Sequence, residues 1–188
     1  MTGSNSGVTN NGQTSFEQYE SSNAEANAER LLEEEYASYM LQNVEQVITN
    51  KFPTDHQSGK EYLYQKGSAN QLIVQNGVRE MDFIIDLNGN LHIGKGHSFL
   101  ANRADVQAAG RIKIGHKRRI SAISNESGHY RPSVQDVLNY QKVFSNAGFD
   151  ISEAWINVYS VKTTKSGYSI PSSVVYSGKV SNLRRKLH

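Results

Sequence analysis

The sequence predicts an α+β protein: an antiparallel β meander with one covering helix and a long amphipathic helix at the N-terminal end. Three observations lead to this prediction. Apolar residues recur at helical spacing early in the chain, short β-branched runs separated by turns follow, and a second helical pattern begins after Ser133. The 188 residues correspond to one domain of roughly 130 residues with an extension.

The N-terminal part of the chain predicts a tail followed by a helix. Residues 1–20 are rich in Gly, Ser, Asn, Thr and Gln without periodicity, which predicts a disordered polar tail. Residues 21–52 predict an amphipathic helical arm that begins at a capping box of Ser22 and Glu25 and is stopped by Pro53. Its apolar positions need cover from the domain or from a partner, and they are Ala28, Leu31, Leu32, Tyr36, Tyr39, Met40, Val44, Val47 and Ile48.

The α+β domain is predicted to span residues 54–178, and residues 179–188 are predicted to form a basic tail. Asn88-Gly89 predicts a hairpin turn, and Ser133 with Asp136 predicts a capping box at the start of the covering helix. Alternating or β-branched runs predict strands at Tyr62–Tyr64, Leu72–Val74, Met81–Leu87, Leu91–Ile93, Val106–Ile114, Arg119–Ile123, Ala154–Val161 and Ser172–Tyr176, the last two as a pair.

The charges are divided between the two parts of the chain. Residues 1–50 hold eight acidic residues and one basic residue, whereas residues 51–188 hold 19 basic and 10 acidic residues. A basic domain with an acidic arm indicates an anionic partner, such as nucleic acid or a nucleotide, with the arm able to mask the basic face. The alternative is a solvated helix beside an ordinary basic domain.

Several classes of protein are excluded by composition and motif. The chain contains no run of about 18 apolar residues, so no membrane span is predicted. Residues 1–20 do not resemble a signal peptide. We therefore expect the protein either to reside in the cytoplasm or to be delivered by a specialised secretion system. The chain has no cysteine, which excludes disulfides, thiol nucleophiles and thiolate metal sites. No metal-ligand spacing and no Walker or Rossmann glycine pattern is present, so neither metal nor cofactor is expected.

The segment Ser124–Ser133 is the strongest candidate for a site, because it joins a predicted strand to a predicted helix. His129 can serve as general acid or base, Tyr130 can stack on a ring or donate a hydrogen bond, and Arg131 can clamp a phosphate. The free N–H groups at the helix start favour an anion there. The alternative is that His129 and Tyr130 only tie the strand end to the helix.

A second candidate segment is the glycine-flanked loop that contains His97 and Ser98. If the sheet brings it near His129, two histidines beside an arginine suit in-line cleavage of RNA without a metal. His92, between Leu91 and Ile93, is expected on the open face of a strand. A basic cluster around His116 indicates either a nucleic-acid or phosphate patch or an exposed hairpin end, and it comprises Arg111, Lys113, Lys117, Arg118 and Arg119.

Three short motifs stand in order along the chain: His97-Ser98-Phe99-Leu100, Ala108-Ala109-Gly110 and Ser127-Gly128-His129-Tyr130-Arg131-Pro132. Over roughly Tyr62–Val158, this set resembles a module of the plant IQ-motif calmodulin-binding family and C-terminal modules of bacterial Rhs-type polymorphic toxins and related effectors. Lys95 and Gly96 stand where the plant pattern has two histidines, and no IQ motif is present, so calmodulin binding is not implied. The resemblance favours the toxin setting.

The sequence leaves three functions open. The first is a toxin- or effector-type enzyme domain acting on a phosphate-bearing substrate, for which RNA is favoured over NAD. The second is a non-enzymatic protein-binding or structural module, which reaches an immunity-like or assembly partner through the N-terminal helix. The third is an ADP-ribosyltransferase that uses His97, Tyr130 and Glu153. For the first, the expected catalytic residues are His97, His129 and Tyr130, and the expected substrate-binding residues are Ser98, Arg131, Ser133, Arg111, Lys117 and Arg119.

Overall fold

The computed structural model describes residues 11–42, 44–163, 165 and 169–187. The chain divides into two units, residues 1–42 and 43–188. Three 3₁₀ turns accompany the helices and strands, which are α1 (Asn11–Gln42), β1 (Lys60–Glu61), β2 (Tyr64–Lys66), β3 (Leu72–Val74), β4 (Glu80–Asp86), β5 (Leu91–Lys95), α2 (His97–Leu100), β6 (Val106–Ile114), β7 (Ile120–Ser124), α3 (Val134–Val137), α4 (Tyr140–Asn146), β8 (Trp155–Thr163), β9 (Ser169–Lys179) and α5 (Leu183–Leu187).

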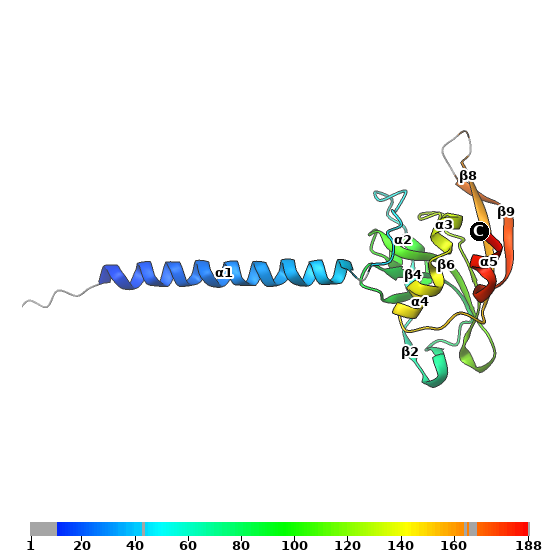
Figure 1. The fold of residues 1–188 in the computed structure, drawn as a ribbon, viewed down its shortest axis with the longest axis horizontal. Helices are drawn as coiled ribbons and strands as arrows, with labels where there is room; N and C mark the ends of the chain where they lie inside the picture. The colour runs from blue at the N-terminus through cyan, green and yellow to red at the C-terminus, as the bar shows by residue number, and fades with distance from the viewer. Residues whose placement is uncertain (1–10, 43, 164, 166–168, 188) are drawn as a thin grey trace, which may run out of the picture. The chain divides into compact units, whose positions relative to one another are not determined.

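The first unit contains helix α1, which confirms the predicted N-terminal helix (Figure 1). Glu, Ala and Leu, which are strong helix formers, are frequent in its second half. The helix already covers residues 11–20, which were expected in the disordered tail, and residues 1–10 of that tail lie outside the described residues. It ends at Gln42 rather than near Asn50, so both predicted boundaries of the helical arm are wrong.

The segment after α1 belongs to the second unit, not to the helix. The Ile48 N–H donates to the Val106 carbonyl at 2.7 Å, and the Val106 N–H donates back to Ile48 at 3.0 Å. The Ile48 side chain is 2% exposed. Val44, Val47 and Ile48 have helical spacing, but this bridge and the burial of Ile48 outweigh the local preference.

The α+β fold with antiparallel strands is confirmed. The main sheet has seven strands in the order β1-β5-β4-β6-β7-β8-β9, and β2 pairs with β3 in a separate two-stranded sheet. Every adjacent pair is antiparallel except β7 and β8, which are parallel because α3 and α4 form the crossover between them. Strand β6 lies beside β4 rather than β5, so the strands do not follow one another in simple meander order.

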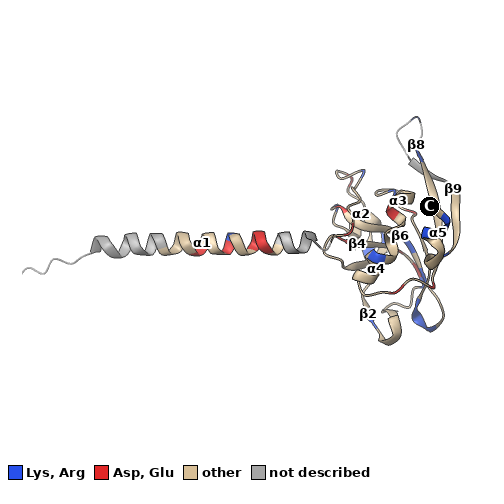
Figure 2. Cartoon of the chain, viewed as in Figure 1, with Lys and Arg blue, Asp and Glu red and all other residues tan. Residues whose placement is uncertain are grey.

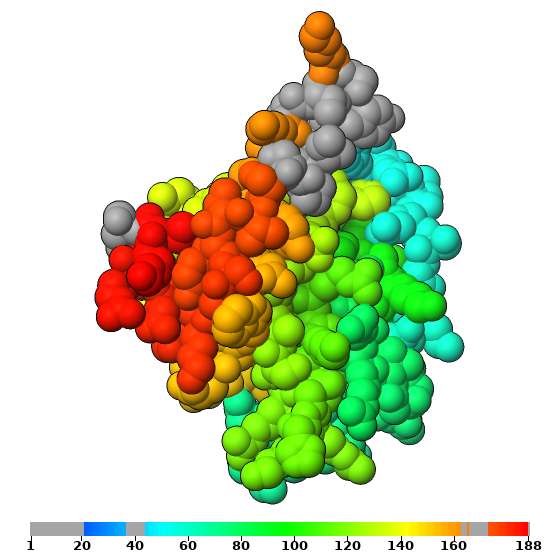
Figure 3. Space-filling view, turned by 90° about the vertical axis from the view of Figure 1, so that its right-hand side faces the viewer, coloured from blue at the N-terminus to red at the C-terminus, as the bar shows by residue number. Residues whose placement is uncertain are grey.

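The two faces of the sheet are covered differently. On the side of Phe83, α4 covers the sheet, and the Phe83 ring lies 5.1 Å from that of Phe144 and 6.2 Å from that of Tyr140, centroid to centroid. On the opposite side, α2 lies near Asp82, which accepts from the Gly96 N–H at 2.9 Å. Helix α2 is a single turn and therefore covers only a small part of this second face, which Figure 3 shows in space-filling form.

The C-terminal residues are part of the fold rather than a tail. Val180 and Leu183 are each 2% exposed, and Leu183 begins helix α5. The Arg184 guanidinium donates to the Asn139 side chain at 3.0 Å, which holds α5 beside the segment between α3 and α4. The predicted basic tail at residues 179–188 is therefore wrong for the described residues, because two apolar side chains anchor it to the core.

Candidate functional site

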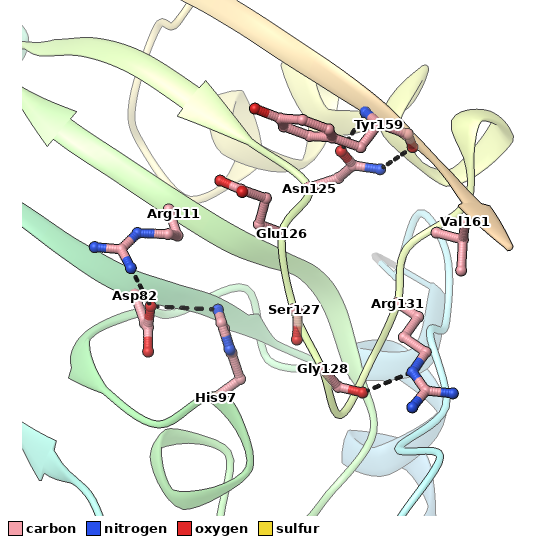
Figure 4. Close-up of a pocket in the computed structure, with 10 residues that line it drawn as sticks. All are labelled: Asp82, His97, Arg111, Asn125, Glu126, Ser127, Gly128, Arg131, Tyr159 and Val161. Atoms are coloured by element: carbon pink, nitrogen blue, oxygen red, sulfur yellow. Dashed lines mark hydrogen bonds and ion pairs between the residues drawn. The ribbon is translucent and has the colours of Figure 1, made fainter. Parts of the chain in front are cut away.

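A solvent-open hollow of about 270 Å³ lies where β7 ends, between that strand end, α2 and β8 (Figure 4). Figure 4 shows Arg111, Asp82 and His97 on one side of the Asn125–Gly128 segment and Arg131 with Val161 on the other. The residues that line the hollow are Asp82, His97, Arg111, Asn125, Glu126, Ser127, Gly128, Arg131, Tyr159 and Val161.

Asn125 fixes the path of the chain at the hollow. Its side-chain oxygen accepts from the Tyr159 N–H at 2.8 Å, and its amide nitrogen donates to the Tyr159 carbonyl at 3.0 Å. The same amide also donates to the Pro132 carbonyl at 3.0 Å. Beyond the end of β7, the Asn125 side chain therefore takes the place of a neighbouring strand and bonds the backbone of β8. Glu126 and Ser127, which follow it, lie beside the hollow.

His97 forms one wall and is largely buried. Its Nε2 lies 2.7 Å from the Gly110 carbonyl oxygen, and because that oxygen only accepts, Nε2 carries the proton. Burial lowers the pKa of His97 below its usual value, although Asp82, 3.9 Å from Nε2, opposes this. His97 is therefore a neutral imidazole at neutral pH, suited to hydrogen bonding or to a role as base.

Two guanidinium groups and two carboxylates complete the charged lining. The Arg111 guanidinium lies 4.0 Å from the Asp82 carboxylate and is half exposed. Glu126 accepts from the Ser124 hydroxyl at 2.9 Å. The Arg131 Nε donates to the Gly128 carbonyl at 2.9 Å, and its guanidinium lies 4.7 Å from the centre of the Phe52 ring. The hollow can therefore bind an anion at either rim, with Glu126 between the two.

The structure does not bring the two predicted histidines to one hollow. His129 turns toward another loop, where its Nε2 lies 2.8 Å from the Asp55 carboxylate. Tyr130 points into the core, is fully buried, and donates its hydroxyl to the Ala104 carbonyl at 2.5 Å. Burial raises the pKa of Tyr130 to about 12. His97 alone of these three predicted catalytic residues lines the hollow.

The predicted substrate-binding residues divide in the same way. Arg111 and Arg131 line the hollow, whereas the fully buried Ser98 hydroxyl accepts from the Asn50 amide at 3.1 Å. Ser133 caps α3 in the predicted capping box and does not line the hollow. Helix α3 has four residues, which is too short to supply the anion site expected at a helix start.

Lys117 and Arg119 lie at the tip of the β6–β7 hairpin, away from the hollow. The hollow is at the other end of this hairpin, where Arg111 pairs with Ser124. Both side chains at the tip are exposed. They do not contribute to the hollow itself.

The arrangement proposed for ADP-ribosyl transfer is not assembled. Glu153 is exposed and accepts from the Lys179 ammonium at 2.6 Å, and neither Glu153 nor Tyr130 lines the hollow with His97. Within the part of the chain that the structure describes, no cluster of three side chains suits a metal ion. None of the described helices has the length and apolar character needed to cross a bilayer.

A separate cluster surrounds His92 on β5. Its Nδ1 lies 2.6 Å from Glu61 and its Nε2 lies 2.8 Å from Asp86. The hydrogen bond that His92 donates to Asp86 raises the pKa of His92, and the one that it donates to Glu61 adds to this, so that the pKa is about 9 although partial burial lowers it. The imidazolium therefore links β1 to the turn that joins β4 and β5.

Sequence reasoning missed Glu126, Asn125 and Asp82 as members of the site. Glu126 and Asn125 lie inside the segment Ser124–Ser133, but the site was predicted from the histidine, tyrosine and arginine of that segment. Their position, directly after a strand and before Gly128, is the signal that favours an exposed carboxylate. Asp82 carried no signal, since its place depends on the pairing of β4 with β6.

No family model, no curated protein and no solved structure matches this chain.

Proposed function

We propose that this chain is an enzyme domain of toxin or effector type that acts on a phosphate-bearing substrate in the hollow beside Glu126. RNA is favoured over NAD as that substrate. The observation that carries the proposal is that Arg111 and Arg131, from a strand and a loop 20 positions apart, line one open hollow with a carboxylate between them. Guanidinium groups bind phosphate oxygens in a fork geometry and stabilise charge that builds up on them.

The residues have distinct roles in this proposal. Arg111 and Arg131 hold the phosphate of RNA, and Glu126 takes the proton of the attacking hydroxyl group or water as its oxygen bonds to phosphorus. The phosphorus–oxygen bond to the leaving group breaks, and the leaving oxygen takes a proton from the water in the open hollow. His97 is neutral and held by Gly110, so it forms the wall behind the phosphate rather than acting as the general acid. His129 and Tyr130 hold the loop in place without touching the substrate.

Turnover of total RNA and of NAD by the purified full chain tests this proposal. Glu126→Gln keeps the shape of the side chain and is expected to lower turnover by about 100-fold or more, as for loss of a general base. Glu153→Gln is the matched control, because Glu153 is exposed and lies outside the hollow. An active Glu126→Gln chain, or absence of turnover on both substrates, would remove the support for an enzyme.

A non-enzymatic module is the second candidate, because several residues of the Ser124–Ser133 segment form hydrogen bonds within the second unit rather than facing solvent in the hollow. Asn125, His129 and Tyr130 join three different segments of the second unit, as a structural corner requires. In this case the N-terminal helix contacts the partner. Removing residues 1–42 then abolishes capture of an immunity-like protein while Glu126→Gln leaves that capture unchanged, which is the opposite pattern to the enzyme proposal.

A further inference from the structure

The open face of the sheet continues from the hollow toward the tip of the β6–β7 hairpin. In one row across the strands Arg111 pairs with Ser124 and Ser124 with Asn157, and in the next row Lys113 pairs with Ala122 and Ala122 with Trp155. A shallow depression of about 210 Å³ lies over these rows and shares Arg111 and Glu126 with the hollow. Figure 3 shows this face, with atoms of β8, β7 and β6 at the surface.

Trp155 presents an aromatic surface on this face in a fixed orientation. Its side chain is half exposed (50%), while its Nε1 donates to the Ser177 hydroxyl at 2.9 Å. Ser177 in turn donates to the Asn157 side chain at 2.7 Å. The polar edge of the indole is therefore satisfied within the sheet, and its face is left for stacking.

The hairpin tip supplies positive charge at the far end of the same path. Lys117, Arg118 and Arg119 are consecutive and exposed, and none of them forms an ion pair with another described residue. Figure 2 colours this basic tip blue, and Arg118 also lines a separate hollow beside β3. Between the tip and the hollow lie Lys113, paired with Glu80 at 3.4 Å, and then Arg111. Cations thus stand at both ends of a path that passes Trp155 in its middle.

We propose that this face binds single-stranded RNA, which runs from the hairpin tip past a base stacked on Trp155 and delivers a phosphate to the hollow. The inference rests on the proposed function and names its substrate as a single strand. A strand of five residues such as β7 spans about 16 Å, which is longer than one nucleotide. Base faces are available for stacking only when the strand is unpaired, so a duplex does not fit Trp155.

The fluorescence of Trp155 gives a direct test, because it is the only tryptophan in the chain. The full chain carrying Glu126→Gln is titrated with an unstructured RNA of about twelve nucleotides, with the same RNA as a duplex, and with a polyglutamate peptide. Only the single strand is expected to quench the indole. Quenching by the peptide, or by duplex and single strand alike, would overturn the proposal.

Variants locate the strand on the face, with binding followed by the anisotropy of labelled RNA. Trp155→Ala is expected to weaken binding at least about fivefold and Trp155→Phe less, because a phenyl ring still stacks. Replacing Lys117, Arg118 and Arg119 by alanine is expected to reduce the slope of log affinity against log salt by about two. Phe99→Ala and Arg185→Ala are the controls, since both residues are exposed on other elements.

The outcomes separate this inference from the function on which it rests. Turnover of NAD without binding of single-stranded RNA would retain an enzyme at the hollow and overturn the RNA face. Binding that depends on Trp155 without turnover by the unmodified chain would retain the face and remove the enzyme. Equal losses in Trp155→Ala and in the Phe99→Ala control would also overturn the proposed path.

Discussion

The imidazole of His97 donates to the carbonyl of Gly110 at 2.7 Å, and this bond joins two of the three sequence motifs. The same glycine passes close to the neighbouring strand, because a Cβ added to Gly110 would lie 1.8 Å from the Ser124 carbonyl oxygen. Gly110 therefore holds the histidine and brings the end of β7 close to β6. Glu126 lies two residues after Ser124 and accepts from its hydroxyl, so the close approach at Gly110 is next to the hollow.

Gly110→Ala tests this relationship. The added methyl group meets a backbone oxygen that cannot move without separating β6 from β7, so we expect a loss of about 1–3 kcal/mol or more in the free energy of unfolding. Denaturant unfolding measures the loss. Gly89→Ala is not a suitable control, because the backbone there has φ +82°. Gly128→Ala is suitable, since nothing lies within 4 Å of its added Cβ, and a comparable loss in that variant would contradict the explanation.

The stability of the fold should fall on the acid side because of His97. Burial lowers the pKa of His97 in the folded state, so the unfolded chain binds a proton more readily once the pH falls below about 6.5. His97→Gln removes this contribution. Transition temperatures between pH 7.5 and 4.5 should therefore fall less steeply for His97→Gln than for the unmodified chain, and parallel curves would refute the assignment.

His92 should act with the opposite sign on the alkaline side. Its pKa is about 9 in the folded chain, so the bonds to Asp86 and Glu61 stabilise the fold fully below pH 6.5 and are lost as the pH rises toward 9. After allowance for solvent screening, this contribution is about 1 kcal/mol. Unfolding measured at pH 6 and pH 9.5 should show the loss in the unmodified chain and its absence in His92→Gln.

Tyr130→Phe separates a structural role from a catalytic one. The change leaves the Ala104 carbonyl without its buried donor, so we expect a loss of about 1–2 kcal/mol in stability. Turnover at a temperature where the variant stays folded should be unchanged. Normal stability together with reduced turnover in this variant would instead indicate that Tyr130 is a catalytic residue.

The second unit should fold without the first. The buried hydrophobic side chains among the described residues begin at Ile48 and all lie in the second unit. A chain of residues 43–188 is therefore expected to unfold cooperatively at the temperature of the full chain, as followed by circular dichroism. The matched comparison is a chain that starts at Phe52, which lacks the Ile48–Val106 bridge and should be less stable.

The α+β class, the N-terminal helix and the strand pattern followed from the sequence, because alternation and helical spacing record which residues are buried. β6 coincides with the predicted Val106–Ile114, and the capping box of Ser133 and Asp136 forms as predicted. These features depend on residues close together in the chain. Local spacing failed at Ile48, where a contact with Val106, 58 positions away, replaced the helix.

The site depended on contacts that no local pattern contains. The sequence placed His129 and Tyr130 together with Arg131, but only the fold decided that Tyr130 faces the core, His129 faces Asp55 and Arg131 lines the hollow. Adjacent residues in a turn point in different directions, and their partners come from distant segments. The sequence by itself therefore determined the fold class and the chemical groups available. The tertiary structure decided which of them meet, because the pairing of β4 with β6 and of β6 with β7 brings Asp82, Arg111 and Ser124 together, and Glu126 follows two residues later.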